Sequence, residues 1–306
     1  MSSQRPPSSL RHFLRDDDLS PLEQHEVLEL ALRLKADPFA TPSLAGPRTV
    51  ATIYDKPTLR TQVSFAAGIA ELGGHPMLIE GSLAGIGVRE SVADVARILG
   101  RQAALIVWRT YQQAWIAEMA QYAGVPVINA LTDDFHPCQL MADLLTIREH
   151  RGPLAGLTVT FVGDGACNVP VSWVWAASKL GFELRIAAPK AYQPSSDLLA
   201  RAGGNIVCTE NVNAAASGAD LLYTDVFVSM GKEAESADRL KDLAPYPVNA
   251  DLVKRAKPDA LVMHCLPAYR GKEISEETLE AHADTIFTEA ENRLHTQKAI
   301  LAWLVG

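Results

Sequence analysis

The sequence predicts an α/β protein built from two doubly wound parallel-sheet domains joined by interdomain helices. Short apolar runs of strand length alternate with segments of helical periodicity through both halves of the chain, and this alternation indicates βαβ units with parallel sheets. Gly152-Pro153 interrupts the pattern near the middle. A chain of 306 residues is long enough for two such domains.

The first half begins with a helix expected over 21–35, which follows the start signal Ser20-Pro21. Apolar, partly β-branched runs then predict strands, and residues at helical spacing predict helices between them. The expected strands are 50–54, 76–79, 103–108 and 126–129, and the expected helices are 61–72, 91–100, 113–123 and 136–149. We expect these elements to form a first domain, residues 1–150.

The second half repeats the alternation and predicts a second domain, residues 151–289. Its expected strands are 157–162, 183–187, 205–208, 220–223, 260–265 and 285–288, and its expected helices are 169–180, 195–201, 211–216 and 250–254. A closing helix over 290–306 is expected to pack back on the first domain. Open α/β sheets bind ligands at the carboxyl ends of their strands, so the two domains should meet at a cleft lined by these ends.

The composition limits the classes of function. With 48% hydrophobic and 21% charged residues, the chain is an ordinary globular protein. A net charge of −8 argues against nucleic-acid and membrane-surface binding, so an anionic ligand would need a local basic cluster. Four cysteines without CxxC spacing favour neither a zinc cluster nor a disulfide framework. Because no signal core or membrane-length apolar run is present either, we expect a cytoplasmic protein.

The stretch 55–64 joins the first predicted strand to its helix and has the features of an anion site. Thr58 is expected to cap the helix, with Arg60 and Thr61 beside it. Unpaired N–H groups and the positive end of the helix dipole would face an anion at this point. An ordinary capped helix with one solvated arginine is the alternative interpretation.

Further polar residues follow the later strands of the first half. Arg109 ends the third expected strand, and His136 and Gln139 lie one turn apart after the fourth. Arginine binds phosphate in a two-pronged manner, and arginine and histidine can polarise a carbonyl. Taken singly, these residues also suit a surface ion pair, a helix-start cap and a solvated side chain.

Candidate residues in the second half are of a different kind. The turn Gly163-Asp164-Gly165 lacks the third glycine of a dinucleotide motif, and the next strand ends without an acidic residue for a ribose, which disfavours nicotinamide binding. Asp225 could hold a cationic amine, and Cys265 is either a catalytic thiol or a buried structural cysteine. We expect neither a metal nor a cofactor.

Together these strand-end motifs resemble those of the ornithine carbamoyltransferases in the aspartate/ornithine transcarbamylase superfamily, over residues 10 to about 304. Arg60-Thr61 is similar to the core of the family's S-x-R-T-R loop, and the segment 136–139, His-Pro-Cys-Gln, resembles its carbamoyl-phosphate motif. The segments 225–231 and 264–267 resemble the marks of the ornithine enzymes, and 291–295 resembles the start of the family's last helix.

The resemblance implies transfer of the carbamoyl group of carbamoyl phosphate to the side-chain amine of ornithine, giving citrulline and phosphate in arginine biosynthesis. It implies Arg109, His136 and Cys265 as catalytic residues and a homotrimer, or a multiple of trimers, as the assembly. The implied carbamoyl-phosphate site is Thr58, Leu59, Arg60, Thr61, Arg109, His136, Gln139 and Arg293. The implied ornithine site is Asn168, Asp225, Ser229, Met230, Cys265 and Leu266.

Three positions depart from the family pattern. The loop reads Thr-Leu-Arg-Thr-Gln over 58–62 instead of S-T-R-T-R, which removes a hydroxyl and a positive charge. Gly85 stands where a glutamine usually reaches the neighbouring subunit's phosphate site, and Phe227 stands where tryptophan is usual. Two of these changes concern the phosphate, and losing one charged hydrogen-bond partner typically costs about 1.5–3 kcal/mol.

The departures leave other hypotheses open. The chain could be a variant transcarbamylase with a modified amine acceptor, or an isozyme resistant to inhibitors that mimic carbamoyl phosphate. It could also be a catalytically inactive binding or regulatory subunit, although the retained arginines, histidine and cysteine argue against this. A nicotinamide oxidoreductase is the remaining alternative. Comparing acceptor amines and testing cofactor binding would distinguish them.

Overall fold

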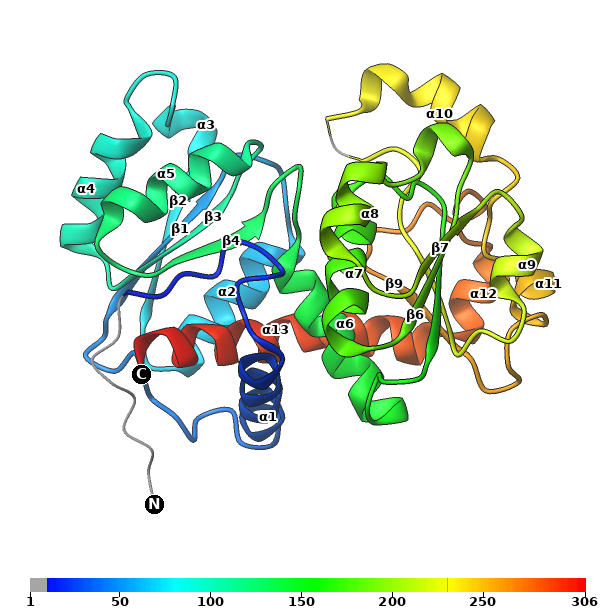
Figure 1. The fold of residues 1–306 in the computed structure, drawn as a ribbon. Coiled ribbons are helices and arrows are strands. Elements are labelled where there is room, and N and C mark those ends of the chain that lie inside the picture. Colours follow the sequence, from blue (N-terminus) through cyan, green and yellow to red (C-terminus); the bar gives the residue numbers. More distant parts are fainter. Residues whose placement is uncertain (1–9, 230) are drawn as a thin grey trace. The chain divides into compact units, whose positions relative to one another are not determined.

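A computed structural model describes residues 10–229 and 231–306 (Figure 1). The chain divides into two compact units, Met1–Cys138 with Leu294–Gly306, and Gln139–Arg293. Each unit contains one parallel β-sheet with helices around it, so the predicted α/β class with two doubly wound sheets is confirmed. The division falls within two helices, α6 (Pro137–Arg151) and α13 (Ala283–Val305). The boundaries predicted near residues 150 and 289 stay predictions.

The sheet of the first unit has the strand order β2-β1-β3-β4, with every pair parallel. The chain builds outward from β1 to β2 and then continues on the other side of β1, so the order reverses between β1 and β3. The elements are α1 (Pro21–Ala36), β1 (Thr49–Tyr54), α2 (Arg60–Glu71), β2 (His75–Glu80), α3 (Gly81–Ala84), α4 (Val92–Gln102), β3 (Leu105–Arg109), α5 (Gln113–Ala123) and β4 (Val127–Leu131).

Local sequence signals fix several of these helices. Ser20 caps α1 in a capping box: its hydroxyl accepts the Glu23 N–H, and the Glu23 carboxylate accepts the Ser20 N–H. Ser91 caps α4 through the Asp94 N–H. The prediction that Thr58 caps α2 is wrong, because Leu59 is the N-cap residue and no side chain caps this helix. The first turn of α2 therefore keeps its backbone donors.

The core of the first unit lies between the sheet and its helices. One cluster joins Ile53 and Trp108 of the strands to Ile116 and Met119 of α5. The helix α2 packs tightly against the end of α13, since a Cβ atom on Gly68 would lie 2.8 Å from Lys298 Cγ. A glycine is therefore needed where these two helices cross.

The sheet of the second unit has the order β7-β6-β5-β8-β9, again all parallel. Its order reverses between β5 and β8. Besides most of α6 and the first part of α13, the unit contains β5 (Thr158–Val162), α7 (Asn168–Leu180), β6 (Glu183–Ala187), α8 (Ser196–Ala202), β7 (Ile206–Thr209), α9 (Val212–Ala216), β8 (Leu221–Thr224), α10 (Ser236–Leu243), α11 (Ala250–Val253), β9 (Leu261–His264) and α12 (Glu276–Ala281).

One predicted strand is wrong. Residues 285–288 are β-branched or aromatic and were expected to form a strand, but they belong to α13. Thr285, Ile286 and Glu289 are buried while Phe287 is 54% exposed, which is the periodicity of a helix packed on one side. Packing thus overrides β-propensity here.

The helices α3, α10 and α12 were not predicted. None of the helices in the described part of the chain has the length and apolarity needed to cross a bilayer.

Candidate functional site

Three loops meet at the carboxyl edge of the first sheet, where the strand order reverses. The Asp55 N–H donates to the Arg109 carbonyl (2.9 Å), which ties the loop after β1 to the end of β3. The Asp133 N–H donates to the Tyr111 carbonyl (2.8 Å), which ties the loop after β4 to the loop after β3. Ligands of open α/β sheets bind at such a reversal, so this edge is the first candidate site.

The N-terminus of α2 opens at this edge. Its first turn contains no acidic residue and no side-chain cap, and Arg60 is its first residue. The first N–H groups of a helix have no partner within the helix, and the helix dipole adds positive potential there. An anion is the natural ligand for this arrangement.

Buried basic groups surround the same edge. Arg109 is 5% exposed, and its Nη1 donates to the Thr61 hydroxyl at 3.5 Å. His136 is also buried and lies in the loop after β4, directly before α6. The structure thus brings the predicted residues Arg109, Thr61 and His136 to the ends of neighbouring strands.

Lys56 was missed by the sequence reasoning. Its ammonium is buried, pairs with Asp133 and lies 4.6 Å from the centre of the Tyr111 ring. Burial is the main cause that lowers the pKa of Lys56, and the nearby Arg109 lowers it further. A lysine two residues after an apolar strand was the available signal, because the end of a parallel strand is where ligand groups are expected.

Gln139 lies in a different environment from His136. Its Nε2 donates to Asp143 Oδ1 (2.8 Å) and Glu289 Oε1 (3.0 Å), and its Oε1 accepts from Arg293 Nη1 (2.7 Å). These four residues belong to the second unit, whereas His136 belongs to the first. The structure therefore joins the predicted residues Gln139 and Arg293 to each other through a buried network.

This network contains two buried acids. Burial raises the pKa of Asp143 well above its usual value, and the neighbouring Glu289 raises it further. Burial likewise raises the pKa of Glu289. Glu289 accepts the Tyr223 hydroxyl (3.0 Å) and the His264 N–H (2.9 Å), so the network reaches the ends of β8 and β9.

The second candidate site lies at the carboxyl edge of the second sheet. Asn168 is the first residue of α7 after β5, Asp225 follows β8, and Cys265 follows β9. The thiol of Cys265 donates to Asp225 Oδ1 at 3.1 Å. Burial and the Asp225 carboxylate raise the pKa of Cys265 well above its usual value. The thiol is therefore held in its protonated form, which argues against a thiolate nucleophile.

The residues after β9 are held by His264. Its Nδ1 accepts the Leu266 N–H at 2.9 Å, so its Nε2 carries the proton and donates to Glu273 Oε1 at 3.2 Å. Leu266 has a φ of +53°, which is rare for a side chain of its size. This hydrogen bond helps to hold the unusual turn beside Cys265.

Two predicted ornithine residues lie on the loop after β8. Ser229 is half-buried on this loop, and Met230 lies outside the described residues. The nearby side chains of Asp225, His264 and Cys265 offer atoms within 4.8 Å of one another, as a metal site would. Both ring nitrogens of His264 already have hydrogen-bond partners, however, so a metal would have to break one of these bonds.

The turn after β5 does not have the chemistry of a dinucleotide site. Asp164 is 4% exposed; its Oδ2 accepts from Arg239 Nη1 at 2.6 Å and its Oδ1 accepts the Ala166 N–H at 3.1 Å. A buried carboxylate thus takes a backbone donor that a pyrophosphate would need. This argues against the nicotinamide alternative.

The backbone conformation at residue 85 favours the glycine found there. Gly85 ends α3 with a φ of +63°, and a Cβ atom there would lie 3.0 Å from the Arg89 Cβ. A glutamine at this position would be strained, because side chains other than glycine rarely adopt this conformation. The backbone conformation of this loop thus explains why residue 85 is a glycine and not a glutamine.

Comparisons with known proteins agree on one family. Residues 11–149 match the carbamoyl-P binding domain of aspartate/ornithine carbamoyltransferase, and residues 155–304 match its Asp/Orn binding domain. The ornithine carbamoyltransferase of Clavibacter michiganensis is 54% identical over 303 residues, covering 96% of this chain and 98% of that protein. That of Renibacterium salmoninarum is 52% identical, with the same coverage.

Solved structures give the same result. The crystal structure of ornithine carbamoyltransferase from Thermus thermophilus matches with a TM-score of 0.89 and 38% identity, covering 98% of this chain and 100% of that chain. Ornithine carbamoyltransferase from Pyrococcus furiosus matches with a TM-score of 0.89 and 39% identity, covering 96% of each chain. The similarity therefore extends over both units.

Proposed function

We propose that this chain, which belongs to the aspartate/ornithine carbamoyltransferase family, transfers the carbamoyl group of carbamoyl phosphate to the side-chain amine of L-ornithine. The products would be L-citrulline and phosphate. The observation that carries the proposal is that the chain contains a basic anion site in one unit and an acidic amine site in the other. Full-length similarity to ornithine carbamoyltransferases supports it.

In the first unit, the phosphate group would bind at the N-terminus of α2 and to Arg109. The uncapped first turn and the absence of acidic residues support this role for residues 58–61, which are Thr58, Leu59, Arg60 and Thr61. Arg109, His136 and Thr61 would polarise the carbamoyl oxygen, on which negative charge develops in the transition state. Gln139 and its hydrogen-bond partner Arg293 belong to the second unit. Gln139 would contact the carbamoyl amide, and Arg293 would help to hold Gln139.

In the second unit, the α-amino and carboxylate groups of ornithine would bind Asn168, Asp225, Ser229 and Met230. The buried Asp225 supplies the negative charge that an ammonium group needs. Cys265 and Leu266 would contact the reacting amine. Because the Cys265 thiol is protonated, we assign it the positioning of the amine and not a nucleophilic attack.

The chemistry consists of positioning and polarisation. The neutral amine of ornithine attacks the carbamoyl carbon, a C–N bond forms, and the C–O bond to phosphate breaks as the amine loses its second proton. The amine must be deprotonated before it attacks, so activity should rise toward alkaline pH. Holding both substrates in the reacting geometry supplies much of the rate enhancement.

A steady-state assay tests the proposal. Purified protein with carbamoyl phosphate should release citrulline from L-ornithine faster than carbamoylated product from acetylornithine, succinylornithine or putrescine. Release of no citrulline would contradict the proposal. Faster carbamoylation of another amine would instead identify a variant transcarbamylase, and binding of both substrates without turnover would identify an inactive subunit.

We also propose that the protein acts in arginine biosynthesis in the cytoplasm and assembles as a homotrimer or a multiple of trimers. Large apolar side chains on neighbouring elements of the first unit support an assembly: Leu59, Val63, Leu78, Leu83 and Val88 are each more than half exposed. The edge strand β2 carries Leu78, and exposed sheet edges invite pairing. Light scattering after size-exclusion chromatography would measure the assembly, and complementation of an arginine auxotroph would test the pathway.

A further inference from the structure

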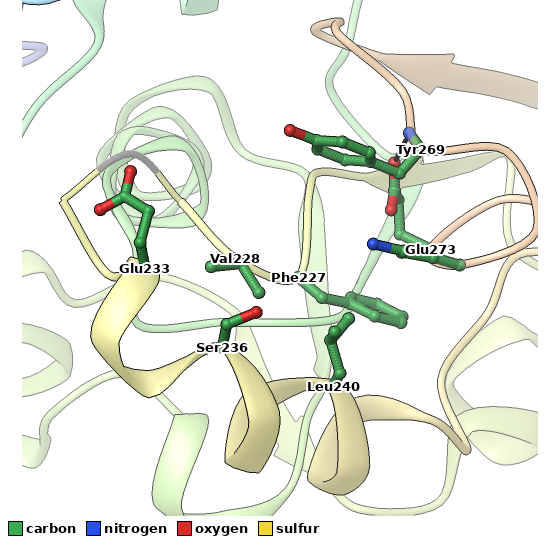
Figure 2. A pocket seen from close by; sticks show the side chains of 8 residues that line it. Phe227, Val228, Glu233, Ser236, Leu240, Tyr269 and Glu273 are labelled. Carbon is green, nitrogen blue, oxygen red and sulfur yellow. Dashed lines mark hydrogen bonds between the residues drawn. The ribbon is translucent and has the colours of Figure 1, made fainter.

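A pocket of about 250 Å³ lies in the second unit, beside the loop that follows β8 (Figure 2). Its lining includes Phe227, Val228, Leu240, Tyr269, Lys272 and Glu273. Among the described residues proposed above for ornithine, which are Asn168, Asp225, Ser229, Cys265 and Leu266, none lines it. The volume is small for a cofactor but suits a ligand of amino-acid size.

Glu273 places a buried acid in the wall of this pocket. Its side chain is 0% exposed, and its Oε1 accepts the Tyr269 N–H at 2.5 Å and the proton of His264 Nε2 at 3.2 Å. Among residues 10–229 and 231–306, no hydrogen-bond donor reaches its Oε2. A buried polar atom of this kind costs free energy unless a partner satisfies it. A ligand with a positively charged N–H donor would supply that partner.

The opposite charge lies at the exposed rim. Lys272 is exposed, and its Nζ lies 4.8 Å from the centre of the Tyr269 ring. Glu233 also lines the pocket; its carboxylate accepts the Gly231 N–H at 3.0 Å and adds a second negative charge. Lys272 would attract the carboxylate of a ligand, whereas Glu233 and Glu273 would repel a simple carboxylic acid that brings no positive charge. A ligand carrying both charges matches the pair.

The rest of the lining consists of the polar Ser236 and three apolar side chains. Figure 2 shows Phe227 and Leu240 at the base of the pocket and Val228 beside them. Phe227 is buried, whereas Leu240 and Val228 are half-buried, so an apolar side chain bound here would leave water.

From these contacts we propose that the pocket is a second binding site, for a zwitterionic α-amino acid with an apolar side chain. The ligand ammonium donates to Glu273 Oε2, its carboxylate pairs with Lys272, and its side chain packs on Phe227 and Leu240. The site goes beyond the proposed transferase activity, because Asn168, Asp225, Ser229, Cys265 and Leu266, the described residues that would bind ornithine, do not line it.

Titration calorimetry on the full chain tests the charge requirement. L-leucine serves as the probe, with isopentylamine and 4-methylpentanoate as analogues that lack its carboxylate or its ammonium. We expect each analogue to bind at least about tenfold more weakly than leucine, because each loses one charge-assisted contact. Equal binding of leucine and either analogue, or no binding of leucine, would overturn the proposal.

Four variants locate the binding. Lys272→Met should weaken leucine binding about tenfold, and Leu240→Trp should block it by filling the pocket. Lys254→Met, which changes an exposed lysine outside the pocket, should leave binding unchanged, and so should Asp225→Asn. Loss of leucine binding in Asp225→Asn would assign it to the proposed ornithine site, and unchanged binding in both Lys272→Met and Leu240→Trp would place it elsewhere; either result overturns the proposal. Citrulline formation is measured separately, so failure of the proposed function would not be confused with failure of this site.

Discussion

The two units have parallel sheets of the same kind, yet opposite charges gather at their ligand edges. At the edge of the first sheet, Lys56, Arg60 and Arg109 lie around an uncapped helix N-terminus. At the edge of the second sheet, Asp225 lies beside a protonated thiol. The strand topology fixes where a ligand binds, whereas the side chains after each strand decide which charge it carries.

The N-termini of the helices after the first strands show the same contrast. The helix α2 leaves its first donors without a side-chain cap. The helix α7 has no side-chain cap either, but the buried Asp164 just before it accepts the Ala166 N–H and pairs with Arg239. A helix N-terminus alone is therefore no evidence for a phosphate site, because a carboxylate of the chain can supply the negative charge that the phosphate would bring.

The largest expected effect is that of Arg109→Ala. Removing this buried guanidinium should lower kcat/KM for carbamoyl phosphate by on the order of a hundredfold or more, because a donor to the developing negative charge is lost. The measurement is steady-state citrulline formation with Arg101→Ala, an exposed arginine of α4, as the matched control. Equal activity in Arg109→Ala and the parent would contradict the role of Arg109 in the basic site of the first unit.

Asp225→Asn should affect the other substrate. We expect the KM for ornithine to rise on the order of tenfold or more while the KM for carbamoyl phosphate stays within about twofold, since a charge-assisted bond to the ornithine ammonium is removed. Asp251→Asn, at an exposed position of α11, is the control. A larger change in the KM for carbamoyl phosphate than in that for ornithine would reverse the proposed assignment of the two sites.

A smaller effect on stability is expected from the buried acids next to Gln139. Burial and Glu289 raise the pKa of Asp143 in the folded protein. A raised folded-state pKa gives stability that is present below the unfolded-state pKa and is lost as the pH rises through the folded-state value. Each tenfold difference in proton affinity between the folded and unfolded states corresponds to about 1.4 kcal/mol of such stability. In Asp143→Asn this loss with rising pH should be absent.

Urea unfolding of the parent and Asp143→Asn at several pH values measures this difference. The free energy of unfolding of the parent should fall with rising pH more steeply than that of the variant. The exposed Asp94→Asn variant should follow the parent. Parallel curves for the parent and Asp143→Asn would show that Asp143 titrates alike in the folded and unfolded states.

The smallest effect is expected from Gln62→Arg, which restores a positive charge near the N-terminus of α2. Gln62 is half-buried, so water screens part of the added charge. We expect the KM for carbamoyl phosphate to fall by less than about tenfold. A gain as large as the loss in Arg109→Ala would mean that this loop, and not the arginine at the end of β3, dominates phosphate binding.

Much of the fold could be predicted from the sequence because its signals are local. The helix α5 and the strand β6 have the predicted bounds, and Ser20 caps α1 as its start signal indicates. The segment 285–288 could not be predicted in the same way: its β-branched residues suit a strand, and only their packing along α13 makes them helical.

The candidate sites divide similarly. Arg109 and Asp225 could be found because alternating strands and helices place strand ends at one edge of a sheet. The engagement of Gln139 with Asp143, Glu289 and Arg293 could not, because up to 154 positions separate these residues in sequence. The buried charge of Lys56 also went unrecognised, because its partner Asp133 comes from the loop after β4, three strands later in the chain.

The sequence by itself thus determined the α/β class, most of the order of strands and helices, and polar residues such as Arg109 and Asp225 at the strand ends. These follow from periodicity and from residues next to one another in the chain. The tertiary structure decided which of those residues meet, which N–H groups of α2 stay uncapped, and that the Cys265 thiol is protonated. Burial and long-range hydrogen bonds set these properties, and both depend on partners that folding brings together.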